Sequence, residues 1–293
     1  MNKLSNLKEL YISYLEVEKN ASKKTIENYN LWINRFIEYS GNVKANEVNK
    51  VLILNYRKHL QKKGLSLKTI NYHIVSLRAF FKFLLRNDID VISPDKLELA
   101  KTSPRTVNYL EEKEIEKLLL MPDEYEKKHI KKIRDKTILL ILFGSGLRVS
   151  ELINLKHNNI KLESNQFWVI GKGSKLRAVF MIEKAKKALE EYLNMKASDS
   201  EYIFSSLSNN NVNKPLNRVS IEKIVKRYAR LAGIQKKVTP HTLRHSFATS
   251  LLLKGADIRS VQTLLGHSSI TTTQIYTHIA DVHLQKIHDL LND

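Results

Sequence analysis

The sequence has 293 residues, no cysteine and a formal net charge of +19 at pH 7. A chain of this length is expected to form two domains, because single domains usually contain about 100 to 200 residues. The absence of cysteine excludes disulfides and thiol nucleophiles. No run of about 18 apolar residues indicates a membrane span, and residues 1–15 lack the order of a secretory signal, so we expect a cytoplasmic protein without a membrane partner.

The positive charge is spread over both halves of the chain. Residues 1–105 contain 19 basic and 10 acidic residues, and residues 106–293 contain 30 basic and 20 acidic residues. A polyanion that contacts both halves is the expected partner, because each neutralised phosphate releases counterions and adds affinity. The alternative is that the charge keeps the protein soluble or reflects an AT-rich genome that favours Lys and Asn. Charge alone does not distinguish DNA from RNA.

The first hundred residues have apolar side chains at three- and four-residue spacing, which predicts helices. Ser22 or Thr25 is expected to cap the second helix, and Gly64 follows the third in the usual helix-stop position. The predicted helices cover residues 4–15, 24–39, 48–62 and 67–85. Aromatic residues at this spacing are expected in the core of a four-helix unit, so only basic residues are taken as DNA-contact candidates. These are Lys23, Lys24, Lys62, Lys63, Lys68, Arg78 and Lys82.

Residues 92–108 lose this periodicity and contain Pro94 and Pro104, which predicts a linker between two domains. Farther along, "QFWVI" and "RAVFMI" flank "GKGSKL", which predicts a β-hairpin with a glycine-containing turn. The rest of the second half is predicted to be helical. An apolar helix within "IRDKTILLILFGSG" is expected to stop at Gly144 and Gly146.

Residues 239–244 carry the first unusual polar group. Thr239 followed by Pro240 predicts a helix start, with a capping hydroxyl and then proline at the first helical position. His241 then lies in the first turn, and Arg244 is expected on the same face three residues later. The apolar stripe of this helix explains neither side chain.

A second polar group follows that helix. Asp257 is expected to cap another helix that ends at Gly266, which places His267 directly after a helix end. A further short helix from about residue 269 is expected to carry Tyr276.

Two upstream motifs each offer a cation in an unusual setting. In "GSGLRVSEL", Arg148 follows a glycine-rich break at the start of a helix, with Glu151 one turn later to orient it. In "GKGSKLR", Lys172 occupies a hairpin turn from which a long side chain reaches outward.

Together these motifs supply two Arg, one Lys, two His and one Tyr, with no metal-ligand cluster of convincing spacing. This set predicts phosphoryl transfer without a metal, ATP or other cofactor. A tyrosine phenol has a pKa of about 10, but neighbouring cations and a base favour its anion. Two guanidiniums can bind both non-bridging oxygens of a phosphodiester, and Lys or His can protonate the departing sugar oxygen. A phosphotyrosine ester is nearly isoenergetic with the phosphodiester, so the strand can be rejoined without ATP.

In this order, "GLRVSEL", "GKGSKLR", "HTLRHSFAT" and "LLGHSSITTTQIYTH" resemble the tyrosine site-specific recombinases of the phage integrase family, most closely the Xer-type members. The phrases "SKKTIENYNLWINRF" and "TINYHIVSLRAFFKFL" resemble that family's core-binding domain, so the resemblance spans nearly the whole chain.

The resemblance implies a mainly α fold with a small β-sheet, arranged as a two-domain C-shaped clamp. Residues 1–91 would form a four-helix SAM-like core-binding domain, residues 92–108 the linker, and residues 109–293 the catalytic domain with a β-hairpin. A C-terminal helix with an apolar stripe of Leu284, Ile287 and Leu291 would dock into a neighbouring protomer; the alternative is packing on its own domain.

The resemblance also implies a role for each polar residue. Arg148 and Arg244 would contact the scissile phosphate, and Tyr276 would be the nucleophile. Lys172 would protonate the leaving group, with Lys175 as its rival for that role. The remaining assignments are His241 and His267 in proton transfer or phosphate contact, Glu151 as a supporting residue, and Lys175 and Arg177 as DNA-backbone contacts.

The implied function is site-specific recombination through a 3'-phosphotyrosyl intermediate and a Holliday junction. Four protomers, alone or with a related recombinase, would assemble on two double-stranded DNA sites. Chromosome or plasmid dimer resolution is favoured because the chain is short and lacks an added arm-binding domain, and a DNA translocase would then be an expected regulator. The alternatives are a mobile-element integrase, a type IB topoisomerase and a non-catalytic DNA-binding protein.

Overall fold

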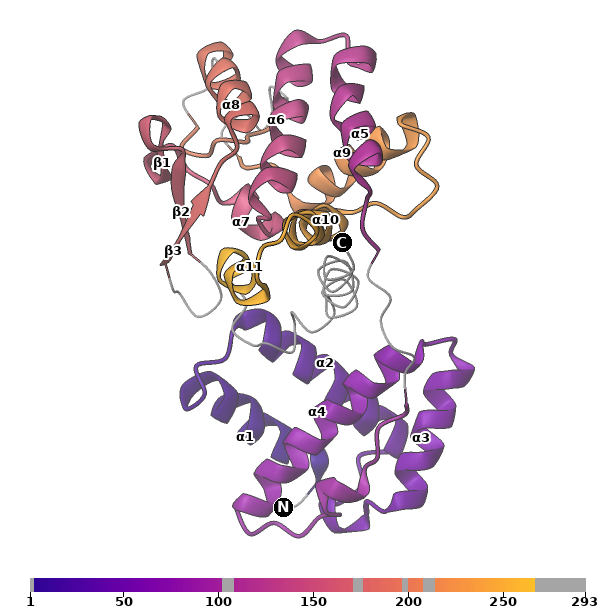
Figure 1. Ribbon diagram of the computed structural model, residues 1–293. Helices are drawn as coiled ribbons and strands as arrows, with labels where there is room; N and C mark the ends of the chain where they lie inside the picture. The colour runs from indigo at the N-terminus through magenta and orange to yellow at the C-terminus, as the bar shows by residue number, and fades with distance from the viewer. Residues whose placement is uncertain (1–2, 102–107, 171–175, 197–199, 208–213, 267–293) are drawn as a thin grey trace, which may run out of the picture. The chain divides into compact units, whose positions relative to one another are not determined.

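The computed structural model describes residues 3–101, 108–170, 176–196, 200–207 and 214–266. The chain divides into two compact units, Met1–Pro104 and Arg105–Asp293. Most of the described residues are helical (Figure 1).

In its described residues, the N-terminal unit is built from four α-helices, as predicted. The hydroxyl of Ser22 accepts a hydrogen bond from the Thr25 backbone N–H and caps the second helix. Gly64 follows the third helix with a φ of +75°, in the left-handed region that a helix stop requires. The helices are α1 (Leu4–Val17), α2 (Lys23–Ser40), α3 (Lys50–Lys62) and α4 (Leu67–Arg86).

The aromatic side chains of this unit divide between its core and its surface. Phe80 and Phe81 on α4 are fully buried, which confirms the expected core positions. Tyr72, by contrast, is 43% exposed and stacks on Trp32 of α2, with ring centroids 5.7 Å apart and planes 6° apart. Lys68 lies one turn before Tyr72, so this aromatic residue lies on the outward, basic face of α4.

The core of the N-terminal unit also contains a buried histidine. His73 is fully buried, and its Nδ1 lies 2.9 Å from the hydroxyl of Tyr56. Burial, and then the nearby charge of Arg35, lowers the pKa of His73 from 6.5 to about 4. The folded unit therefore holds this histidine neutral in a pH range where an unfolded chain would protonate it.

This histidine is expected to make the N-terminal unit sensitive to acid. Below pH 6.5 the unfolded chain binds a proton that the folded chain takes up only near pH 4, so the free energy of unfolding should fall over that range. His73 should contribute about 2 to 3 kcal/mol to this fall. Urea titrations between pH 7 and 4, followed by Trp32 fluorescence in a Trp168→Phe background, measure it. His73→Gln should reduce the fall, and an equal fall in both proteins would contradict the assignment.

The C-terminal unit is organised around α6 (His129–Ser145). Residues 138–143 of this helix are apolar on all sides, and the helix packs against α5 (Glu112–Tyr125), α8 (Glu183–Met195) and α10 (Pro240–Leu253) (Figure 1). A helix with apolar residues all round is expected to be enclosed by its neighbours. The other helices are α7 (Val149–Ile153), α9 (Arg218–Leu231) and α11 (Ile258–Leu265).

The end of α6 differs from the prediction, because the helix runs through Gly144 and ends at Gly146. A Cβ on Gly144 would lie 2.7 Å from Cγ1 of Ile182, so this glycine permits close packing rather than a helix stop. Gly146 has a φ of +62° and provides the left-handed cap.

The predicted hairpin is present as β2 (Gln166–Ile170) and β3 (Leu176–Phe180), paired antiparallel. A short strand, β1 (Ile160–Lys161), adds to β2, so the sheet in the described residues has the order β1-β2-β3. Phe167 pairs with Val179 on the buried face, whereas Trp168 on the opposite face is exposed. The predicted mainly helical fold with a small sheet is thereby confirmed.

Residues 92–101 of the expected linker lie against α4 within the N-terminal unit. Leu97 is buried there, and its carbonyl accepts a hydrogen bond from Nε of Arg78. Asn71 exchanges two hydrogen bonds of 2.9 Å with the backbone of Ala100. These contacts fix the path of the chain up to residue 101.

Candidate active site

Arg148 lies at the start of α7, where the glycine-capped end of α6 reverses the chain. Its backbone N–H and its Nη1 donate to the two carboxylate oxygens of Glu151, at 2.9 and 2.8 Å. The Glu151 side chain is only 4% exposed and that of Arg148 28% exposed. The pairing expected from "GLRVSEL" is therefore present, and the Arg148 side chain remains partly exposed.

Glu151 is ionised in this setting. Burial alone would raise its pKa, but the hydrogen bond from the Arg148 backbone and the charges of Arg177 and Arg148 outweigh burial and lower the pKa below its usual value. Arg177, on β3, donates from Nη2 to the same carboxylate at 2.9 Å. One carboxylate therefore orients two guanidiniums.

Arg244 is held from inside the protein. It lies on α10, whose start at Thr239 and Pro240 agrees with the prediction, because the Thr239 hydroxyl accepts from the Thr242 N–H. Arg244 is only 4% exposed. Its Nη1 donates to the carbonyl of Gly146 and its Nη2 to that of Leu265, each at 2.5 Å.

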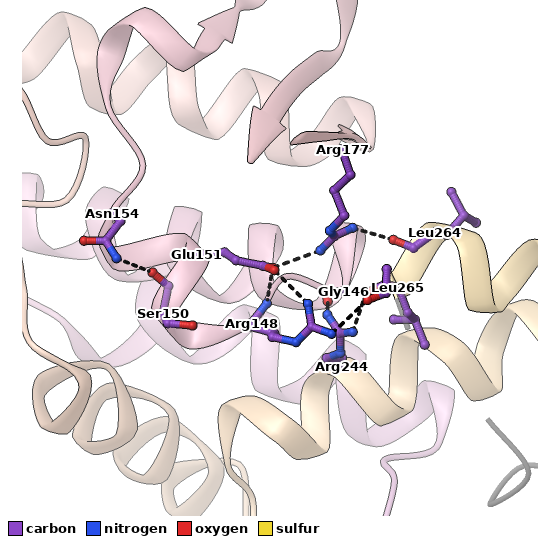
Figure 2. A network of polar contacts seen from close by, with 10 residues as sticks. Gly146, Arg148, Ser150, Glu151, Asn154, Arg177, Arg244, Leu264 and Leu265 are labelled. Carbon is purple, nitrogen blue, oxygen red and sulfur yellow. Dashed lines mark hydrogen bonds and ion pairs between the residues drawn. The ribbon is translucent and has the colours of Figure 1, made fainter. Parts of the chain in front are cut away.

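The last turn of α11 receives a guanidinium at each of three consecutive carbonyls (Figure 2). The helix begins at the predicted cap, Asp257, and ends at Gly266, which has a φ of +62°. Because helix C-terminal carbonyls carry partial negative charge, they are natural acceptors for guanidinium groups. The pairs are Arg177 with Leu264, Arg244 with Leu265, and Arg148 with Gly266.

His241 lies at the second residue of α10 and its side chain is exposed. Partial desolvation by the surrounding residues lowers its pKa most, followed by the positive charges of Arg218, Arg244 and Arg148. Its imidazole is therefore favoured in the neutral form, which is the form that accepts a proton. The expected shared face is only partly realised, because Arg244 points inward while His241 remains at the surface.

Several predicted site residues lie outside the described residues. Lys172 and Lys175 precede β3, which begins at Leu176. His267 directly follows Gly266, the last described residue, and Tyr276 and the expected C-terminal helix come after it. The described part of the site therefore consists of Arg148, Glu151, Arg177, His241 and Arg244.

The DNA-contact candidates divide into exposed and engaged side chains. Lys23, Lys24, Lys62, Lys63, Lys68 and Lys82 are exposed, and Lys24 pairs with Glu27 at 2.9 Å. Arg78 donates to the Leu97 carbonyl, and Arg177 is 13% exposed and bonded to Glu151 and Leu264. The position of Arg177 between these two partners is the feature that sequence reasoning missed. Strand alternation signals it, because Arg177 shares the inward face with Val179.

The network's chemistry is that of an anion site. The network contains three guanidiniums and one carboxylate. Two of the guanidiniums, on Arg148 and Arg244, come from helices far apart in the sequence. Guanidinium pairs match the geometry of phosphate oxygens and favour negative charge that develops on them. In the part of the chain that the structure describes, no group of three or more His, Asp or Glu side chains is arranged to hold a metal ion. No helix among these residues is long and apolar enough to span a membrane.

Gly146→Ala is expected to destabilise the C-terminal unit by about 2 to 4 kcal/mol. The left-handed φ of +62° disfavours a side chain there, and the added Cβ would lie 2.5 Å from Cδ1 of Phe247. Gly233 is a matched control, because its φ is +70° and no described atom lies within 4 Å of its added Cβ. Gly233→Ala should therefore cost only about 1 kcal/mol. Urea denaturation followed by Trp168 fluorescence in a Trp32→Phe background measures both, and equal losses would show that the contact with Phe247 is unimportant.

Comparison with known proteins identifies the family of the chain. The sequence pattern of the phage integrase family matches residues 108–283. The chain belongs to this family of tyrosine recombinases. The pattern of the phage integrase N-terminal SAM-like domain matches residues 9–88 of this tyrosine recombinase, which confirms the predicted fold class.

Its relatives include Xer-type proteins over nearly the full length. Tyrosine recombinase XerA of Pyrococcus furiosus is 38% identical over 98% of this chain and 94% of its own. Tyrosine recombinase XerD of Halalkalibacterium halodurans is 34% identical over 98% of both chains. The crystal structure of XerH site-specific recombinase bound to palindromic difH substrate, a post-cleavage complex, has a similar fold, with a TM-score of 0.75, 24% identity and coverage of 100% of this chain and 86% of that one.

Proposed function

We propose that this tyrosine recombinase is a site-specific DNA recombinase that cleaves and rejoins strands through a 3'-phosphotyrosyl intermediate and a Holliday junction. The observation that carries the proposal is the meeting of Arg148 and Arg244 at adjacent carbonyls of the α11 end, directly before His267. This arrangement supports a phosphate site between segments that are distant in the sequence. The similarity to tyrosine recombinases XerA and XerD over nearly the full chain supports its use on DNA.

In the proposed reaction, the phenolate oxygen of Tyr276 attacks the scissile phosphorus as the bond to the 5' sugar oxygen breaks. Arg148 and Arg244 neutralise the charge that builds on the non-bridging oxygens. Lys172 gives its proton to the departing 5' oxygen, and His241 and His267 accept the phenolic proton or contact the phosphate. Reversal by a 5' hydroxyl restores the phosphodiester and the free tyrosine. No nucleotide cofactor or metal is required for this balance.

The proposed domains divide the work on double-stranded DNA. Residues 1–91 would bind the duplex through the exposed lysines, residues 92–108 would connect the parts, and residues 109–293 would perform the chemistry. We infer that four protomers assemble on two recombination sites in the cytoplasm, alone or with a related recombinase. Dimer resolution is the favoured role, with a DNA translocase as regulator; integration of a mobile element by the same chemistry is the second candidate.

The test starts with DNA sites selected by the protein from genomic fragments. A supercoiled plasmid with two direct repeats of such a site should be resolved into two circles in EDTA and without ATP. Efficient relaxation of any supercoiled plasmid would instead indicate a type IB topoisomerase. Binding without strand cleavage would indicate a non-catalytic DNA-binding protein. The genomic position of the site, near a replication terminus or at the ends of an element, then decides between the two recombination roles.

A further inference from the structure

Arg177 extends from β3 into the interior of the catalytic unit. It pairs in register with Val169, beside the buried pair of Phe167 and Val179. A charged side chain on the inner face of a sheet requires buried partners. Its two terminal nitrogens have them, because Nη2 donates to Glu151 and Nη1 to the Leu264 carbonyl (Figure 2).

The Glu151 contact links Arg177 to Arg148. One oxygen of the Glu151 carboxylate accepts from the Arg148 backbone N–H and from Arg177, at 2.9 Å each. The other oxygen accepts from Nη1 of Arg148 at 2.8 Å. The carboxylate is thus fixed from two sides, and the Arg177 contact limits its rotation away from Arg148.

The Leu264 contact links Arg177 to the end of α11. The aliphatic stem of Arg177 also packs against Gly266, where an added Cβ would lie 2.7 Å from Cδ of Arg177. The carbonyl of Gly266 is in turn an acceptor for Arg148 at 3.1 Å. Arg177 therefore contacts both neighbours of Arg148 in this network.

We propose that Arg177 is a positioning residue that couples β3 to Glu151 and to the α11 end, and so fixes Arg148. It acts without touching the phosphate. This inference rests on the proposed function. It replaces the expectation that Arg177 contacts the DNA backbone.

The planar guanidinium is essential to this role. It donates in two directions at once, to a carboxylate and to a carbonyl, whereas a lysine ammonium is a compact point charge on a flexible stem. Arg177→Lys should therefore fail as Arg177→Met does. A phosphate contact would behave differently, because lysine retains the charge that binds phosphate.

The experiment measures single-turnover cleavage of a nicked duplex that carries the selected site, with protein in saturating excess. Arg177→Lys and Arg177→Met should each slow cleavage about 10- to 100-fold, because a misplacement of about 1 Å at a reacting centre can cost about 100-fold. The dissociation constant for the duplex and its salt dependence should stay unchanged. Lys117→Met, which removes an exposed charge from α5, should leave cleavage and binding unchanged and serves as the control.

A double variant tests whether Arg177 acts through Glu151. If it does, Arg177→Met combined with Glu151→Gln should be no slower than the slower single variant, because both remove the same link. A role in global stability alone would lower the melting temperature without slowing cleavage by the folded protein. Independent multiplication of the two rate losses would also contradict the coupling.

Other outcomes overturn the proposal directly. Recovery of the wild-type cleavage rate by Arg177→Lys would do so. Arg177→Met that binds DNA more weakly, with the slope of log affinity against log salt reduced by about one, but cleaves the bound duplex normally would also do so. If the wild-type protein forms no covalent adduct, the proposed function fails, and hydrogen exchange in DNA-free protein still decides the role of Arg177. Arg177→Met should then speed amide exchange in α7 and the last turn of α11, and unchanged exchange there would overturn the positioning role.

Discussion

Arg244→Ala is expected to slow strand cleavage by about 10²- to 10³-fold, which is the usual effect of removing one donor that stabilises developing negative charge. The buried guanidinium reaches the anion site from inside the protein, between the carbonyls of Gly146 and Leu265. In the proposed reaction, its loss would leave Arg148 as the one remaining guanidinium of the pair that neutralises the phosphate. Single-turnover cleavage of a nicked duplex measures the loss.

The same substitution is expected to lower stability. Gly146 and Leu265 are buried and would each lose a donor, and a buried carbonyl without a partner costs about 1 to 3 kcal/mol. Arg244→Lys should recover little activity, because one ammonium lacks the fork that reaches both carbonyls. Lys117→Ala, at an exposed site on α5, controls for loss of charge. Cleavage at the wild-type rate by folded Arg244→Ala would show that this arginine is only structural.

Local signals in the sequence were sufficient for the elements that carry the site. The Thr239 and Pro240 pair marks the start of α10, and Asp257 and Gly266 mark both ends of α11. These predictions succeed because a cap is decided by residues within one turn of it. The hairpin follows for the same reason, since its strand alternation and its turn are both local.

The network around the α11 end could not be read in the same way. The Gly146 acceptor lies 98 residues from Arg244, and the Gly266 acceptor lies 118 residues from Arg148. Such contacts depend on how helices pack. Helical spacing predicts that Arg244 shares the face of His241, whereas Arg244 is buried and His241 is exposed. For Gly144 the local sequence predicts a helix stop, whereas its role is a close contact with Ile182, a residue 38 positions away that local spacing does not reveal.

Arg177 is the residue for which the structure adds most to the sequence. The family resemblance implies a contact between this arginine and the DNA backbone. The alternation of β3 gives better information, because it places Arg177 on the face of Val179. An inward arginine must be paired inside the protein, and Glu151 with the Leu264 carbonyl supplies the pairing.

The central claim is that Tyr276 is the nucleophile. The most direct measurement is covalent trapping on a nicked duplex that carries the selected site, followed by mass spectrometry of the nucleotide-linked peptide. The nick lets the short fragment that carries the new 5' hydroxyl diffuse away. Religation is then prevented, and the 3'-phosphotyrosyl adduct accumulates. The wild-type protein and Tyr125→Phe, a control at an exposed tyrosine of α5, should both give an adduct mapped to Tyr276. Tyr276→Phe should give none. An equal adduct from Tyr276→Phe, or a nucleotide mapped to another of the 12 tyrosines, would contradict the assignment.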